Sequence, residues 1–216
     1  HGLTVVGDIE DIQIRRVTQM HEQDLKFLKR LAQEYGYAFN VRGKLLTFAA
    51  LEGLRATRAV TVLRPGDLAR YAFRDRIKDT PRKASAKYLD PKTKRLIEFE
   101  VASEEEVVPK TSADTLRLNP RAESAAQARA KSKAALRRAQ DQTTVCTCTL
   151  WGTPGLVAGV NVELAEFGQL SGVYLVARSV HRIDRSGGYV TELELRRVKA
   201  RAVASQGKGN KPMVAT

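Results

Sequence analysis

Residues 143–198, TTVCTCTLWGTPGLVAGVNVELAEFGQLSGVYLVARSVHRIDRSGGYVTELELRRV, contain four runs in which apolar and polar side chains alternate. Such alternation between turn residues is typical of half-buried antiparallel strands, and Ser186-Gly187-Gly188 between the last two runs predicts a hairpin. The stretch therefore predicts a small antiparallel sheet that curls into a barrel, which upstream residues complete or cover. The four runs are Thr143–Trp151, Val160–Leu164, Val173–Ile183 and Tyr189–Val198.

An alanine-rich segment precedes these strands and predicts a helix over residues 120–140. Asn119 can cap this helix, Pro120 suits its first position, and Leu136 is almost its only bulky apolar residue. Because such a helix buries little apolar area, we expect it to lie very close to a flat surface. Its basic residues predict a solvated face or an acidic neighbour rather than a nucleic-acid contact, since side chains that read bases are nearly absent. They are Arg129, Lys131, Lys133, Arg137 and Arg138.

Residues 1–66 predict a small α+β unit, the remainder of a larger N-terminal region. We expect a short strand in Asp11–Thr18, a helix over 22–35 and a hairpin over 37–48. Gly36 follows the helix at the usual capping position. Arg64-Pro65-Gly66 then predicts a domain boundary. Beyond it we expect three strands and a polar loop, at Leu68–Ile77, Ala84–Leu89, Arg95–Val101 and residues 104–118.

The net charge of +13 is the unusual bulk property of the chain. Residues 143–198 are neutral, and the excess lies mainly in 67–142 and in 199–216, which we expect to form a basic flexible tail. A positive field attracts nucleic acid, acidic protein or anionic lipid. No apolar run approaches the roughly 20 residues of a membrane span, so we expect no membrane insertion. The chain starts at His1 rather than Met, and we expect further sequence upstream.

The sequence contains no catalytic constellation, which predicts that the protein is not an enzyme and needs no cofactor or metal. Cys146 and Cys148 point to one face of a predicted strand, where they cannot bridge easily, and we expect buried, reduced thiols. His181 has no nucleophile beside it in the sequence, and we expect a hydrogen-bonded structural histidine. Glu104–Glu106 is the only dense carboxylate group, and no apolar pocket is predicted around it.

Two stretches resemble one known family. Residues 19–48, QMHEQDLKFLKRLAQEYGYAFNVRGKLLTF, are similar to a helix-and-hairpin segment of phage late control D proteins, the baseplate hub proteins of contractile tails. Related hub modules occur in R-type bacteriocins and in VgrG spike proteins. In this first stretch the resemblance is carried by Asp24, Leu25, Phe27, Leu28, Leu31 and Gly36. In the C-terminal stretch it is carried mainly by Gly152, Pro154, Gly159, Gly172, Tyr174, His181, Gly188, Tyr189 and Thr191.

The resemblance implies an α+β, mainly β fold: a tube-like antiparallel β-barrel over 67–198 with one packed helix, preceded by the small α+β unit. It implies a homotrimer in the tail baseplate of a virion, assembled in the host cytoplasm. Such a hub adapts the six-fold tail tube to the three-fold spike. Its partners would be the tail tube protein, the spike protein, other baseplate proteins and the tape measure, with DNA only in transit through the channel.

Two alternative functions stay open at the level of sequence. The net charge of +13 also suits a basic nucleic-acid-binding module, whose binding would weaken steeply with salt. Some hub relatives carry cell-wall hydrolase domains, so a hub-associated hydrolase component is the second alternative.

Overall fold

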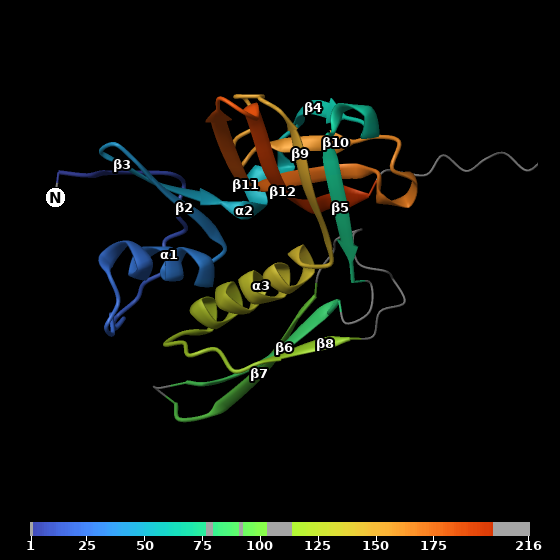
Figure 1. The fold of residues 1–216 in the computed structure, drawn as a ribbon. Coiled ribbons are helices and arrows are strands. Elements are labelled where there is room, and N and C mark those ends of the chain that lie inside the picture. Colours follow the sequence, from blue (N-terminus) through green and yellow to red (C-terminus); the bar gives the residue numbers. More distant parts are fainter. Residues whose placement is uncertain (1, 77–79, 91–92, 103–113, 201–216) are drawn as a thin grey trace, which may run out of the picture.

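The computed structural model describes residues 2–76, 80–90, 93–102 and 114–200 (Figure 1). They form a six-stranded curled half-barrel, two three-stranded sheets and three α-helices. Figure 1 shows helix α3 (Ala125–Asp141) in the middle of the molecule, with the half-barrel on one side and the strands β6, β7 and β8 on the other. The predicted fold class, α+β and mainly β, is confirmed.

The half-barrel contains the four strands predicted from residues 143–198. Their bounds are β9 (Thr144–Trp151), β10 (Asn161–Leu164), β11 (Gly172–Asp184) and β12 (Gly188–Ala200). The order in the sheet is β4-β10-β11-β12-β9-β5, in which β4 (Ala59–Leu63) and β5 (Arg70–Asp75) are the end strands. The predicted hairpin is present: β11 and β12 pair antiparallel from Gly172↔Ala200 to Asp184↔Gly188.

One face of the half-barrel holds the hydrophobic core. Cys146, Cys148 and Leu150 point inward from β9, and Leu193 and Leu195 point inward from β12, as the alternation of these strands predicts. Both cysteines are free and buried, so they pack as the small apolar thiols we expected. The remaining core residues are Leu63, Leu68, Leu156, Val162, Leu164, Tyr174 and Val176.

The sheet differs from the expected barrel in two respects. β4 pairs parallel with β10, although it precedes Arg64–Gly66, so the sheet takes strands from both sides of the expected domain boundary. Within the described residues, β4 and β5 have a neighbour on one side only, so the sheet is an open half-barrel rather than a closed tube. Register and pairing partners are long-range properties, which local alternation does not specify.

The N-terminal unit is a three-stranded sheet with helix α1 (Asp24–Glu34) and the short helix α2 (Leu51–Ala56), which sequence reasoning missed. The predicted hairpin is confirmed as β2 (Tyr37–Arg42) and β3 (Leu45–Ala50). The strand expected in 11–18 was wrong: the structure has no strand there, and β1 (Thr4–Val6) pairs parallel with β3 instead.

The backbone of residues 11–18 finds partners outside any sheet. The carboxylate of Glu123 accepts hydrogen bonds from the backbone N–H groups of Arg15 and Arg16, at 2.7 and 3.0 Å. The side chain of Gln127 donates to the carbonyl oxygen of Gln13 at 2.6 Å. The segment therefore docks at the start of α3, and the hydrogen bonds that a strand ladder would supply come from side chains.

A second three-stranded sheet contains β6 (Lys83–Leu89), β7 (Leu96–Ala102) and β8 (Thr115–Leu118), in the order β7-β6-β8. We expected β6 and β7 to complete the barrel, but they form this separate sheet. The predicted loop over 104–118 was wrong at its end, because residues 115–118 pair with β6 as a parallel strand. Glu104–Glu106 lie outside the described residues, as do residues 201–216 of the expected tail.

Helix α3 begins five residues later than the sequence predicts. Ser124, not Asn119, is its N-cap, and the Ser124 hydroxyl accepts a hydrogen bond from the backbone N–H of Gln127. The prediction of a close flat surface agrees with the packing. α3 lies against β6, where Ala128 of the helix and Ala84 and Ala86 of the strand are fully buried.

Ion pairs join α3 to the N-terminal unit. Asp141, at the end of α3, pairs with Arg55 of α2, and both residues are buried. Lys131 pairs with Glu34 of α1 at 3.0 Å, and Lys133 pairs with Glu52 of α2 at 2.8 Å. Lys131 and Lys133 thus have the acidic neighbours that we expected, and Arg137 lies near Asp141 and Glu52.

Burial changes the titration of the groups around this ion pair. Desolvation raises the pKa of Asp141, although the charge of Arg55 opposes the rise. Desolvation, followed by the like charge of Arg55, lowers the pKa of Arg137 to about 10. Arg55 and Asp141 are buried and Arg137 is half-buried, so loss of Arg55 or Asp141 leaves an uncompensated buried charge.

The first prediction concerns the buried ion pair. Asp141→Asn removes one charge and leaves the buried Arg55 guanidinium without a counter-ion, so we expect the free energy of unfolding to fall by about 3 kcal/mol. The matched control is Glu100→Gln, which breaks an ion pair with Lys83 whose two side chains are more than half exposed. The control should cost less than about 1 kcal/mol in urea unfolding. Equal losses for the two variants would contradict the prediction.

The second prediction concerns pH. Burial acts to raise the pKa of Glu34, but the hydrogen bond and charge of Lys131, with help from Arg30, outweigh burial and hold this pKa below its ordinary value of 4.5. The ionised carboxylate therefore stabilises the fold above about pH 4.5, and this contribution is lost as the pH falls through the folded-state pKa.

We expect Glu34→Gln to lower the urea midpoint at pH 7 and to flatten its decline below pH 4.5. The measurement is a series of urea unfolding curves between pH 3 and pH 7. Glu10→Gln, at an exposed residue, is the control and should keep the wild-type profile. The same decline for Glu34→Gln and wild type would show that the contact with Lys131 contributes nothing.

Candidate assembly surface

The residues that carry the family resemblance in the first stretch lie on α1 or just after it. They pack the helix against its neighbours or form its ends. Asp24 is the first helical residue and accepts a hydrogen bond from the Gln19 side chain at 2.8 Å. Gly36 follows the helix with φ +82°, the left-handed conformation expected of a capping glycine. Leu28 and Leu31 are half-buried, as is Phe27, over whose ring the guanidinium of Arg30 lies.

Leu25 departs from the expected apolar stripe of α1. Its side chain is 53% exposed, whereas Ala32 on the same helix is buried. The described part of the chain provides no cover for this end of the helix. The 3.6-residue period therefore identified the stripe correctly but not the extent of its burial, which depends on neighbouring elements.

Most of the C-terminal motif residues gather where β9 ends and where the β11–β12 hairpin closes. A Cβ atom at Gly152 would lie 1.9 Å from a ring carbon of Tyr189, so only glycine fits under this ring. The Tyr189 hydroxyl lies 3.0 Å from Nδ1 of His181, and the Thr191 hydroxyl lies 3.1 Å from the same nitrogen. Exposed Pro154 is in the loop after β9, where Thr153 donates its N–H to the Thr191 hydroxyl.

Both ring nitrogens of His181 are engaged in this network. The Ser179 hydroxyl donates to the carbonyl oxygen of Leu156 at 2.5 Å, and its oxygen lies 3.0 Å from Nε2 of His181. Nε2–H therefore donates to Ser179, and Nδ1 accepts from a hydroxyl of Tyr189 or Thr191. Because the Ser179 proton points to a carbonyl, this pair is not arranged as a nucleophile and its base. The expected hydrogen-bonded histidine agrees with these contacts.

The remaining motif residues shape turns and core. Gly159 and Gly188 have φ +98° and +69°, and Gly188 closes the hairpin. Gly172 opens β11 opposite Leu164. Tyr174 is fully buried, its hydroxyl donates to the carbonyl oxygen of Leu170 at 2.6 Å, and burial raises its pKa. The two motif groups therefore lie in different parts of the fold, one on helix α1 and the other in the half-barrel and its turns.

The third prediction tests the close contact at Gly152. Gly152→Ala forces the Tyr189 ring away from its place, which breaks its contact with His181, so we expect a loss of about 2 kcal/mol in the free energy of unfolding. Gly155→Ala is the matched control in the same loop, because a Cβ atom there meets nothing within 4 Å. Its effect should be below about 1 kcal/mol. Fluorescence of the neighbouring Trp151 would also change in the first variant only.

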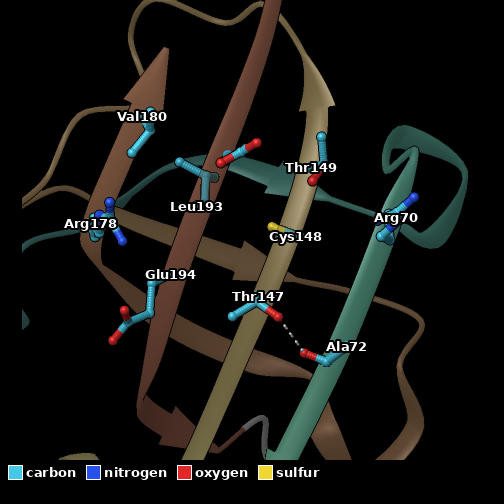
Figure 2. Close-up of a pocket in the computed structure, with 10 residues that line it drawn as sticks. Arg70, Ala72, Thr147, Cys148, Thr149, Arg178, Val180, Leu193 and Glu194 are labelled. Atoms are coloured by element: carbon cyan, nitrogen blue, oxygen red, sulfur yellow. Dashed lines mark hydrogen bonds between the residues drawn. The ribbon is translucent and has the colours of Figure 1, made fainter. Parts of the chain in front are cut away.

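The face of the half-barrel opposite the core is polar and open. Figure 2 shows it across β5, β9, β12 and β11, where a shallow hollow of about 230 Å³ lies between Arg70 on one side and Arg178 on the other. The hollow is lined by rows of side chains that face one another across neighbouring strands, such as Arg70–Thr149–Glu192 and Ala72–Thr147–Glu194. We name this surface, together with the hairpin turn at Arg185–Gly187, the open face.

Arginines dominate the charge of the open face. Glu192 pairs with Arg182 at 3.4 Å, and Glu194 pairs with Arg196 at 3.1 Å, so both acidic groups are already neutralised. Arg70, Arg178 and Arg185 are exposed and form no ion pair within the described residues. In the turn, the Asp184 carboxylate accepts hydrogen bonds from the backbone N–H groups of Gly187 and Ser186, which lower its pKa.

Large apolar side chains are exposed at the same end of the half-barrel. Trp151, at the end of β9, is 70% exposed, and Ile183, beside the hairpin turn, is 79% exposed. Sequence reasoning placed both residues in strands but did not single them out. Alternation alone assigns a side to each residue, and only the cross-strand register places Trp151 beside Val190 and Ile183 opposite Tyr189, near the hairpin turn.

The described residues contain no cluster of three or more His, Cys, Asp or Glu side chains that could hold a metal ion. Among the described residues, no helix has the length and apolar character needed to cross a membrane. The geometry of the open face suits contacts with another macromolecule, since it is broad, shallow and rich in exposed arginine.

The structure is similar to three solved tail proteins, two of which come from prophages. A tail protein from Neisseria meningitidis MC58 superposes with a TM-score of 0.64 at 14% identity, over 89% of this chain and 61% of that protein. The 43-kDa tail protein of prophage MuSo2 from Shewanella oneidensis gives 0.65 at 16% identity, over 91% and 61%. The prophage tail protein gp18 from Listeria monocytogenes EGD-e gives 0.55 at 11% identity, over 90% and 60%.

This chain has the fold of phage tail proteins. It spans about three fifths of the length of the three tail proteins. No protein-family model matches the sequence. No curated protein matches it either.

Proposed function

We propose that this chain is a structural subunit of a phage tail or of a phage-tail-like particle, and that it forms part of the baseplate hub. The observation that carries the proposal is the fold, which this chain shares with solved tail proteins over about nine tenths of its length. The residues that resemble late control D proteins support the finer assignment, because they form the turns and the core contacts of this fold.

The form of the half-barrel supports a role in assembly. Within the described residues, β4 and β5 each have an edge with no partner strand. Such edges present unpaired N–H and C=O groups, which a neighbouring subunit can pair. Val60 and Val62 on β4 and Tyr71 on β5 are exposed beside these edges, so such pairing would also bury apolar area.

We propose a homotrimer that joins the tail tube protein to the spike protein within the virion, together with other baseplate proteins and the tape measure. DNA would meet the hub only in transit. We also propose that the subunit acts without catalysis, a role supported by the hydrogen bonds that engage Ser179 and His181.

The fourth prediction tests this function through the mass in solution. We expect size-exclusion chromatography with light scattering to give three times the chain mass of 23.9 kDa at high protein concentration. Negative-stain images of these particles should show three-fold rings. A monomer at every concentration would contradict the proposed trimer. A zone of clearing on cell-wall substrate would contradict the proposal of a non-catalytic subunit.

A further inference from the structure

We propose that the open face of one copy binds the acidic N-terminal segment, residues 2–14, of a second copy. The inference rests on the proposed function, because it assumes that the protein forms a homo-oligomer, and it names the two surfaces that meet. These surfaces are different parts of the chain, so the contact is heterologous and closes into a ring when the rotation per subunit permits.

The N-terminal segment carries the charge that the open face lacks. Residues 2–14, GLTVVGDIEDIQI, contain Asp8, Glu10 and Asp11 and no basic residue. All three acidic residues are exposed, and none forms an ion pair within the described part of the chain. The open face offers Arg70, Arg178 and Arg185, which are likewise exposed and unpaired there, so the two surfaces are electrostatically complementary.

Both surfaces also expose apolar side chains. In the segment, Val5, Val6 and Ile9 are 57%, 44% and 48% exposed. On the open face, Trp151 stands at the end of β9 and is 70% exposed. Tryptophan and arginine are among the residue types that carry most binding energy in protein interfaces. Burial of apolar side chains between the segment and the open face would add to the attraction of the charges.

The segment is held in place before any partner arrives. β1 pairs with β3, the Tyr37 hydroxyl accepts the backbone N–H of Glu10 at 2.9 Å, and Gln127 holds the carbonyl oxygen of Gln13. The acidic residues between these contacts therefore project from a fixed backbone, which lowers the entropy lost on association. The same contacts hold the segment on the sheet of its own N-terminal unit and at the start of α3, so a second copy supplies the open face.

The fifth prediction tests the contact by charge reversal. Arg70→Glu with Arg185→Glu reverses the open face, and Asp8→Lys with Asp11→Lys reverses the segment. Each pair should raise the dissociation constant of the oligomer at least about tenfold, as measured by light scattering at low salt, because like charges then meet. The chain that carries all four substitutions should recover the wild-type oligomer, since its charges are again complementary.

A mixture of the two reversed proteins gives a sharper result. Both contacts between unlike proteins are complementary, because the acidic segment of one meets the arginines of the other and the reversed segment meets the reversed face, whereas contacts between like copies repel. We therefore expect association to return only in the mixture and in alternating order, and a three-membered ring, which needs one contact between like copies, should not close. The matched control is Lys29→Glu with Arg117→Glu, which reverses two exposed basic residues elsewhere and should keep the wild-type mass. Urea midpoints of all variants should agree with wild type, which excludes unfolding as the cause of dissociation.

The outcomes separate this inference from the proposed function. An oligomer that persists in both reversed proteins overturns the inference and leaves the proposed trimer standing, held by other contacts such as the strand edges. A wild-type monomer at every concentration overturns both. If reversal of the open face abolishes binding of a duplex DNA probe at low salt and leaves the oligomer intact, the face serves nucleic acid, and the inference fails.

Discussion

The structure depends on the buried ion pair between Arg55 and Asp141. Arg55 lies on α2, which leads into β4, and Asp141 ends α3, which leads into β9. The pair therefore fixes the places where the chain enters two strands of the half-barrel. Removing either partner would leave the other charge buried and unpaired, so the ion pair strongly disfavours any separation of the two helices.

Helix α3 extends this constraint to the rest of the molecule. Its alanines allow close approach to β6, and its lysines reach the carboxylates of Glu34 and Glu52 on the N-terminal unit. The helix therefore joins three sheets while covering little of the half-barrel, whose polar face stays open (Figure 1). Within the described residues, the charged face is uncovered and β4 and β5 each have one edge without a partner strand, and these features support the proposed role in assembly.

Sequence reasoning succeeded where local chemistry decides the structure. Alternation placed β9 to β12 within a residue or two of their true ends, and the glycine turns fixed the hairpin at Gly188. Sequence reasoning failed where residues far away in the chain decide the local structure. The expected strand over 11–18 docks on Glu123 and Gln127 instead, and the expected cap Asn119 gave way to Ser124. The candidate surface was missed because its arginines lie on separate strands.

The sequence by itself determined the mainly β fold, the alternation of the C-terminal strands, the buried thiols and the close packing of an alanine-rich helix. Those features follow from side-chain period, backbone freedom and size, which are local properties. Only the tertiary structure decided that β4 joins the sheet, that the sheet formed by the described residues is an open half-barrel and that Arg70 and Arg178 share a face. These features depend on the register between strands far apart in the chain, which local sequence does not encode.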